Sequence, residues 1–85
     1  MAHHASSRFW KAYRRLPSDI RDHADRCYDL LVLNPQHPSL QLKKVGDYWS
    51  VRIGTSYRAL AIEVEDGLLW IWIGARDEYE RLIRS

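Results

Sequence analysis

Three apolar segments in the C-terminal half of the chain carry its strongest structural signal. They read WSVRIG at residues 49–54, YRAL at 57–60 and LWIWIGARDEY at 69–79. Each contains an arginine at its edge or on the polar phase of its alternation. Because a charged side chain is costly to place among β-branched and aromatic residues, these arginines should face water or a ligand. Cations clustered on one face of a sheet predict a site for an anion such as nucleic acid.

The residues around these segments predict an α+β domain. Alternation and turn residues predict strands over 48–53, 57–64 and 68–73, with a weaker one within 40–45. Upstream, apolar residues recur at helical spacing in a short helix that ends before Pro17 and in a second one that runs to about residue 33. We therefore expect an N-terminal helical hairpin packed on a small antiparallel sheet of three to four strands. Asp77 is a candidate cap for a short C-terminal helix.

Length and composition limit the possible functions. The 85 residues suit a single domain over 1–85, with residues 1–6 expected to be flexible, and the net charge of +2 is mildly basic. The lone Cys27 excludes an intramolecular disulfide or a thiolate zinc site, and neither a metal nor a cofactor is expected. The sequence lacks an apolar run of about 18 residues and a signal-peptide pattern, so we expect a cytoplasmic protein with no membrane partner.

The period of two along the strands groups the candidate site residues. Arg52 shares a face with Ser50, opposite Trp49 and Val51, and Arg58 and Arg76 are expected to join it. Counting back from Arg76 places Trp70 and Trp72 on the same phase. Lys43 and Lys44 alternate, so at most one of them can point at the site. Guanidinium groups for phosphate and indoles for unstacked bases are what binding of single-stranded RNA requires.

The ordered set of these segments resembles the RelE/ParE superfamily of bacterial type II toxins. The resemblance spans residues 9–83 and rests on FWKAY (9–13) before Leu16-Pro17, NPQHPSL (34–40) leading into Lys43-Lys44, and the three arginine-bearing segments. It implies a small toxin neutralised by a cognate antitoxin protein. RelE-like members cut messenger RNA on the ribosome, whereas ParE-like members poison DNA gyrase without cutting RNA.

The resemblance also assigns roles. It implies that Arg52, Arg58, Arg76 and Tyr79 are catalytic, and that Lys43 and Lys44 bind RNA together with the first two of these arginines. We interpret Trp70 and Trp72 as packing residues or as part of an antitoxin groove. Several departures from the family pattern bear on activity. Ser50 stands where a second lysine is frequent, and Ala75 and Arg76 stand where one or two histidines are expected. Tyr79 is not at the usual tyrosine spacing, and the usual N-terminal strand is absent or very short.

Metal-free RNA cleavage needs a base, an acid and charge stabilisation of the phosphorane. Arginine supplies the stabilisation but is a poor proton acceptor. The candidates for the base are Lys43, Lys44, Tyr79, Glu78 and His37. The leading hypothesis is therefore a metal-independent mRNA endoribonuclease that inhibits translation. The alternatives are a gyrase poison without ribonuclease activity and a catalytically degenerate module that binds an antitoxin.

Overall fold

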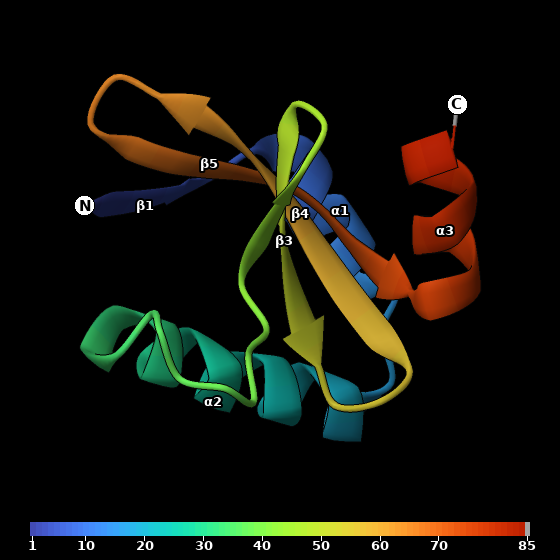
Figure 1. The fold of residues 1–85 in the computed structure, drawn as a ribbon. Helices are drawn as coiled ribbons and strands as arrows, with labels where there is room; N and C mark the ends of the chain where they lie inside the picture. Colours follow the sequence, from blue (N-terminus) through green and yellow to red (C-terminus); the bar gives the residue numbers. More distant parts are fainter. Residues whose placement is uncertain (85) are drawn as a thin grey trace.

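The computed structural model describes residues 1–84, which form one five-stranded sheet and three helices (Figure 1). The strands are β1 (Ala2–Ala5), β2 (Lys43–Val45), β3 (Tyr48–Ile53), β4 (Tyr57–Val64) and β5 (Gly67–Ala75). The helices are α1 (Ser7–Arg14), α2 (Ser18–Leu33) and α3 (Arg76–Arg84). The sheet order is β1-β5-β4-β3-β2. The α+β class is confirmed, and the sheet has one strand more than the three to four that the sequence predicted.

The four C-terminal strands form an antiparallel meander, because turns at glycine reverse the chain between them. Gly46 (φ 61°) and Gly54 (φ 62°) have left-handed backbones, which only glycine adopts without steric cost. The predicted ranges 48–53 and 57–64 coincide with β3 and β4. The last strand extends beyond the predicted 68–73 at both ends. These strands supply the surface on which the helices pack.

The first strand corrects the expectation that residues 1–6 are flexible. β1 pairs in parallel with the start of β5, and this makes the sheet mixed. The Ala2 amide donates to the Asp66 carbonyl (2.9 Å), and the Ser6 amide donates to the Trp70 carbonyl (3.0 Å). Gly67 permits this pairing, since a Cβ there would overlap the Ala2 backbone. A four-residue strand without hydrophobic alternation leaves little signal in the sequence.

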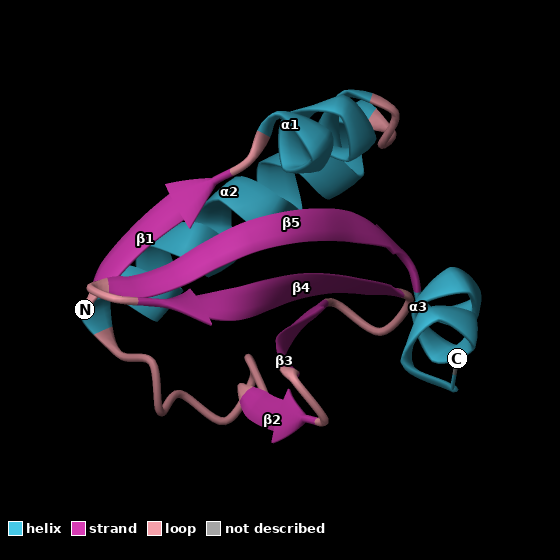
Figure 2. Cartoon of the chain, turned by 90° about the horizontal axis from the view of Figure 1, so that it is seen from above, coloured by secondary structure: helices cyan, strands magenta, loops and turns pink. Residues whose placement is uncertain are grey.

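The two N-terminal helices lie together on one face of the sheet (Figure 2), as the predicted hairpin requires. The Ser6 hydroxyl caps α1 by accepting from the Phe9 amide at 3.1 Å. Pro17, which has no amide hydrogen to donate, stands immediately before α2. The Tyr13 hydroxyl of α1 donates to the Asp25 carboxylate of α2 at 2.7 Å, so a polar contact links the two helices.

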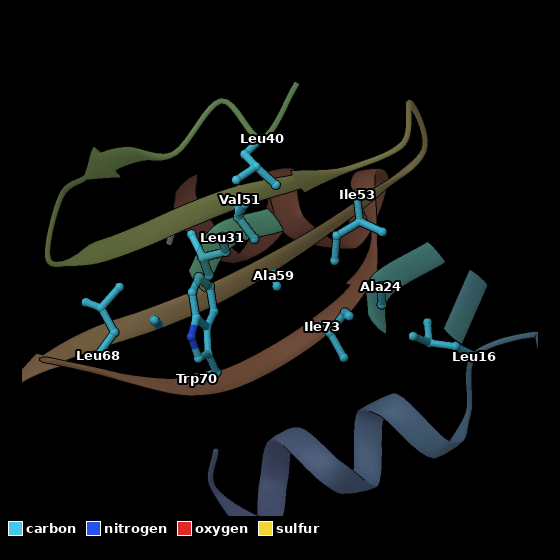
Figure 3. Packing of buried hydrophobic residues seen from close by; sticks show 11 residues of the cluster. Leu16, Ala24, Leu31, Leu40, Val51, Ile53, Ala59, Leu68, Trp70 and Ile73 are labelled. Atoms are coloured by element: carbon cyan, nitrogen blue, oxygen red, sulfur yellow. The ribbon is translucent and has the colours of Figure 1, made fainter. Parts of the chain in front are cut away.

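The hydrophobic core lies between these helices and the sheet. Figure 3 shows Trp70 among the buried aliphatic side chains. Leu40, in the loop before β2, is completely buried in the same cluster. Burial of such a side chain stabilises the fold by about 1.5–3 kcal/mol, so Leu40 anchors the loop against the sheet. This anchor fixes where the chain enters β2.

The third helix leaves the end of β5 on the side away from α2 (Figure 1). It begins at Arg76, one residue before the predicted cap Asp77. The Arg76 amide donates to the Ser56 carbonyl at 2.8 Å, which ties the start of α3 to the β3–β4 turn. Over residues 1–84, no helix combines the length and the apolar character needed to cross a membrane.

Candidate functional site

The two faces of the sheet differ in chemistry. Val51, Ala59 and Ile73 are cross-strand neighbours that face α1 and α2 and belong to the core. The next residue on β3 is Arg52, which lies directly opposite Arg58 on β4. Paired residues on antiparallel strands point to the same side of a sheet, and successive residues point to opposite sides. The sheet therefore presents two arginines on the face that α1 and α2 leave uncovered.

A pocket of 240 Å³, which we call the arginine pocket, lies on this face between the sheet and α3. Its polar and charged lining residues come from the loop before β2, from three strands and from α3: Gln41, Lys43, Ser50, Arg52, Arg58, Arg76, Tyr79 and Glu80. All four residues predicted to be catalytic are thus brought together. Four cationic side chains outnumber the single carboxylate, so the lining of the pocket carries an excess of positive charge.

The guanidinium groups of the pocket are incompletely neutralised. Arg58 Nη1 donates to the carbonyl of Tyr57 at 2.8 Å, which carries no formal charge. The Nε of Arg76 lies 3.2 Å from Glu80 Oε1, one turn along α3. Arg52 Nε is buried and has no hydrogen-bond partner within residues 1–84. An unpaired buried donor is costly, and a movement of the Arg52 side chain toward an oxyanion in the pocket would relieve that cost.

The electrostatic environment of Arg58 reflects the same clustering. Burial and then the neighbouring Arg76 and Arg52 lower the pKa of Arg58 from its ordinary value, while Tyr79 and Glu80 act in the opposite sense. Like charges held close together in the pocket repel one another. A bound phosphate would replace this repulsion with attraction to each guanidinium.

Tyr79 closes the pocket from the α3 side. Its hydroxyl donates to Ser50 Oγ at 3.2 Å, and both residues are buried, Ser50 to 2% exposure. The position that the family resemblance assigns to a lysine therefore holds a small hydroxyl that packs against the tyrosine. This contact fixes the orientation of Tyr79 and joins α3 to β3.

The two neighbouring lysines separate as the alternation predicted. Lys43 lies opposite Ser50 and lines the arginine pocket. Lys44 lies on the other face, where its Nζ is 3.2 Å from Glu63 Oε1, and Glu63 also accepts from Trp49 Nε1 at 2.8 Å. The Trp49 hydrogen bond and then Lys44 lower the pKa of Glu63. Lys44 is therefore outside the pocket, although the sequence grouped it with Lys43.

The two tryptophans of β5 do not share a face, which corrects the parity count from Arg76. A register shift pairs Leu60 with Trp72 but Ala61 with Trp70, leaving Ile71 as an extra residue. Trp70 therefore turns into the core, is 6% exposed and donates from Nε1 to His3 Nδ1 at 3.1 Å. Trp72 stays on the arginine face, half-buried, with its indole over Gly74. Only Trp72 is placed to meet a partner on that face.

The pocket also contains residues that the sequence did not single out as site residues. Gln41 follows the buried Leu40, and no periodicity marks it. Glu80 forms an ion pair with Arg76, which their i, i+4 spacing on α3 favours. Of the five candidate bases, Lys43 and Tyr79 line the pocket, whereas Lys44, Glu78 and His37 do not. Residues 1–84 contain no cluster of three potential metal ligands.

A larger cleft of 510 Å³ lies between α1, α2 and the sheet, and it is lined mainly by apolar and aromatic side chains. Trp10 and Tyr28 on its two sides are partly exposed. It contains no lysine or arginine. The chemistry expected from the sequence is therefore concentrated in the smaller arginine pocket.

Comparison with solved structures identifies the same fold elsewhere. A chain in the crystal structure of the RelB–RelE antitoxin–toxin complex from Methanococcus jannaschii superposes with a TM-score of 0.71, covering 93% of this chain and 96% of that one, at 18% identity. The isolated RelE toxin of E. coli gives a TM-score of 0.63, with 96% and 95% coverage and 17% identity. This chain has the RelE fold.

The intact E. coli RelBE toxin–antitoxin complex contains a further example of the RelE fold, with a TM-score of 0.62, 19% identity and coverage of 85% and 92%. At such low identity the likeness establishes the architecture and leaves function to the site. Neither models of protein families nor curated protein sequences give a match to this chain.

Proposed function

We propose that this chain is a cytoplasmic toxin of a type II toxin–antitoxin system that binds and cleaves messenger RNA in the arginine pocket, without a metal or cofactor. The observation that carries the proposal is the convergence of Arg52, Arg58 and Arg76 on one pocket, with the buried Arg52 Nε unpaired within residues 1–84. The RelE fold supports it, because proteins named as RelE toxins share this architecture.

The arrangement suits the charge changes of RNA cleavage. A base removes the proton of the 2′-hydroxyl, and the 2′-oxygen attacks the adjacent phosphorus to give a phosphorane with added negative charge, which preorganised guanidinium groups stabilise. The bond from phosphorus to the 5′-oxygen then breaks, the leaving oxygen takes up a proton, and a 2′,3′-cyclic phosphate remains. Lys43 and Tyr79 are the candidate bases among the groups that line the pocket. Tyr79 already donates its proton to Ser50, so the phenol must break that contact to take part in proton transfer. Lys43 makes no such contact, and it can act as a base only as the neutral amine, in which case it is no longer one of the cations of the pocket.

An antitoxin is the proposed protein partner. Two of the chains with the RelE fold come from complexes of RelE with RelB. An antitoxin segment with acidic side chains complements a pocket lined by four cations and one carboxylate. Trp72, half-buried on the same face, offers an apolar contact beside it. Messenger RNA, presented by the ribosome, and the antitoxin would then compete for the arginine pocket.

One observation favours a second function, that of a gyrase-binding toxin without ribonuclease activity. Ser50 and Tyr79 satisfy one another, and the lysine that the family pattern places at residue 50 is missing. An anion-binding pocket without a committed base is compatible with binding alone. A degenerate module that only binds an antitoxin has the same pocket but arrests no growth.

Inducible expression in bacteria distinguishes these functions. The wild type, the Arg58→Ala/Arg76→Ala double variant and Lys44→Ala are compared for growth and for new RNA 5′ ends. Lys44→Ala is a matched control, because it removes a cation from the opposite face and breaks only an exposed ion pair. The proposal predicts growth arrest with discrete cuts for the wild type and for Lys44→Ala, and neither for the double variant. Arrest without cuts would support gyrase as the target, and soluble expression without arrest would support the antitoxin-binding module.

A further inference from the structure

Gln41, which lines the arginine pocket, has an unusual backbone. Its φ of 46° lies in the left-handed region, and it is the one non-glycine residue with positive φ in the described chain, residues 1–84. A side chain with a Cβ crowds its own backbone in this conformation, so the conformation persists only where the surroundings impose it.

Contacts on both sides of Gln41 impose that conformation. The preceding Leu40 is completely buried, and its carbonyl accepts from the Arg52 amide at 2.7 Å. The Gln41 amide donates to the Pro38 carbonyl at 3.3 Å. Two residues later, Lys43 enters β2 opposite Ser50. The backbone of Gln41 is therefore held between a buried anchor and the edge of the sheet, beside the pocket.

The side chain of Gln41, by contrast, is exposed to solvent. It lines the arginine pocket, and its carboxamide has no hydrogen-bond partner within residues 1–84. Ser50 and Tyr79 are already bonded to each other, and Glu80 to Arg76. Gln41 is thus the neutral polar group of the pocket that remains available to a ligand.

The chemistry of a carboxamide differs from that of the cations around it. Guanidinium and ammonium groups only donate hydrogen bonds, whereas a carboxamide donates and accepts in one plane. Contacts to phosphate position a nucleic acid, and contacts to base edges read its sequence. Planar amides pair with base edges that present a donor beside an acceptor.

We propose that Gln41 reads the edge of a nucleobase next to the phosphate held by Arg52, Arg58 and Arg76, and so determines which RNA sequence enters the pocket. This inference rests on the proposed ribonuclease function. The arginines fix the backbone of the RNA, and the constrained loop presents the carboxamide to the adjoining base. Gln41 determines which RNA sequence is preferred, whereas the arginines strengthen the binding of RNA of any sequence.

Three substitutions at this position separate the carboxamide from the backbone. Gln41→Ala removes the amide and keeps a Cβ, and Gln41→Glu leaves only acceptors. Gln41→Gly removes the amide and relieves the backbone crowding, so its folding is not threatened by the positive φ. Each variant is expressed in bacteria beside the wild type, and base frequencies at the nucleotides flanking each new RNA 5′ end are compared.

The wild type is expected to show a base preference at one flanking nucleotide. Gln41→Ala and Gln41→Gly should both reduce that preference by about 5-fold or more while cutting continues. Gln41→Glu should shift it toward bases that present an amino group. An unchanged preference in Ala and Gly variants that still cut RNA would overturn the role of Gln41 and leave the ribonuclease intact. Absence of cuts by the wild type would overturn both proposals together.

Discussion

Arg52 and Arg58 are directly opposite one another on adjacent antiparallel strands, and Arg76 is close enough to lower the pKa of Arg58 further. Cross-strand pairs of like charge destabilise a sheet. The pair therefore lowers the stability of the free protein, and an anion bound in the arginine pocket would offset that cost.

Replacing Arg58 by glutamine should stabilise the free protein. The substitution removes one like charge from the pocket and keeps a shorter polar side chain. The expected gain is up to about 1 kcal/mol, because the loss of the Nη1 hydrogen bond to the Tyr57 carbonyl offsets part of it. Urea unfolding of both proteins at low ionic strength measures it. Salt should narrow the difference, since screening weakens the repulsion in the wild type. A less stable Arg58→Gln variant at low salt would contradict the repulsion.

Gly74→Ala should destabilise the protein through Trp72. A Cβ at residue 74 would overlap the Trp72 indole, so the ring must leave its place on the arginine face. Overpacking of this kind costs about 1–3 kcal/mol. Denaturant unfolding of the single variants and of Gly74→Ala/Trp72→Leu forms a double-mutant cycle. The double variant should lose less stability than the two single losses combined. If the two single losses of stability add up to the loss in the double variant, the Trp72 indole is not what disfavours a Cβ at residue 74.

Tyr79→Phe should leave the buried Ser50 hydroxyl without its partner. The expected loss is about 1 kcal/mol or more, because a buried polar group then has no hydrogen bond. Adding Ser50→Ala should recover part of that stability. Thermal unfolding measures both effects, and RNA cleavage by the folded Tyr79→Phe variant tests the phenol separately. Full cleavage by that variant would remove Tyr79 from the catalytic residues and favour Lys43 as the base.

Stability should fall on acidification because of His3. Burial, then the N-terminal ammonium group and His4, lower the pKa of His3 below its ordinary 6.5. The unfolded chain therefore takes up a proton at higher pH than the folded chain does. The contribution of His3 is complete above the unfolded-state pKa and is lost as pH falls through the folded-state pKa. Protonation of Nδ1 also ends its role as acceptor for Trp70.

Comparison of wild type and His3→Gln isolates this effect from the other histidines. Unfolding midpoints are measured at pH 7.5 and pH 5. Between these two pH values the wild type should lose more stability than the variant. An equal loss in both proteins would show that the contact between β1 and Trp70 does not depend on the protonation of His3.

Local patterns predicted most of the fold and part of the site. Alternation predicted β3 and β4 with correct bounds, and it correctly separated Lys43 from Lys44. It failed at Trp70, because the extra residue Ile71 in β5 reverses the parity of everything before it. Bulges depend on how two strands pair, which a single strand does not reveal.

The remaining differences arise from long-range contacts. β1 can form because Gly67, which is distant from it in the sequence, lets the N-terminal backbone approach β5. Gln41 reaches the arginine pocket because Leu40 is anchored in the core, and no periodicity reports that anchor. Residue types alone predicted the three arginines as site residues, since cations in and beside apolar strands must face water or a ligand. Gln41 creates no such conflict, and residue types did not predict it as a site residue.

Binding of single-stranded RNA to the arginine pocket tests the central claim most directly. A fluorescently labelled RNA oligonucleotide is titrated with the wild type, Arg58→Gln and Lys44→Gln at several salt concentrations. We expect the wild type and Lys44→Gln to bind alike, with affinity falling as salt rises by a log–log slope of about −0.7 per phosphate neutralised. Arg58→Gln should bind at least about 10-fold more weakly, because a charge-assisted contact is lost. Equal binding by the two variants, or no binding by the wild type, would contradict the assignment of this pocket to RNA.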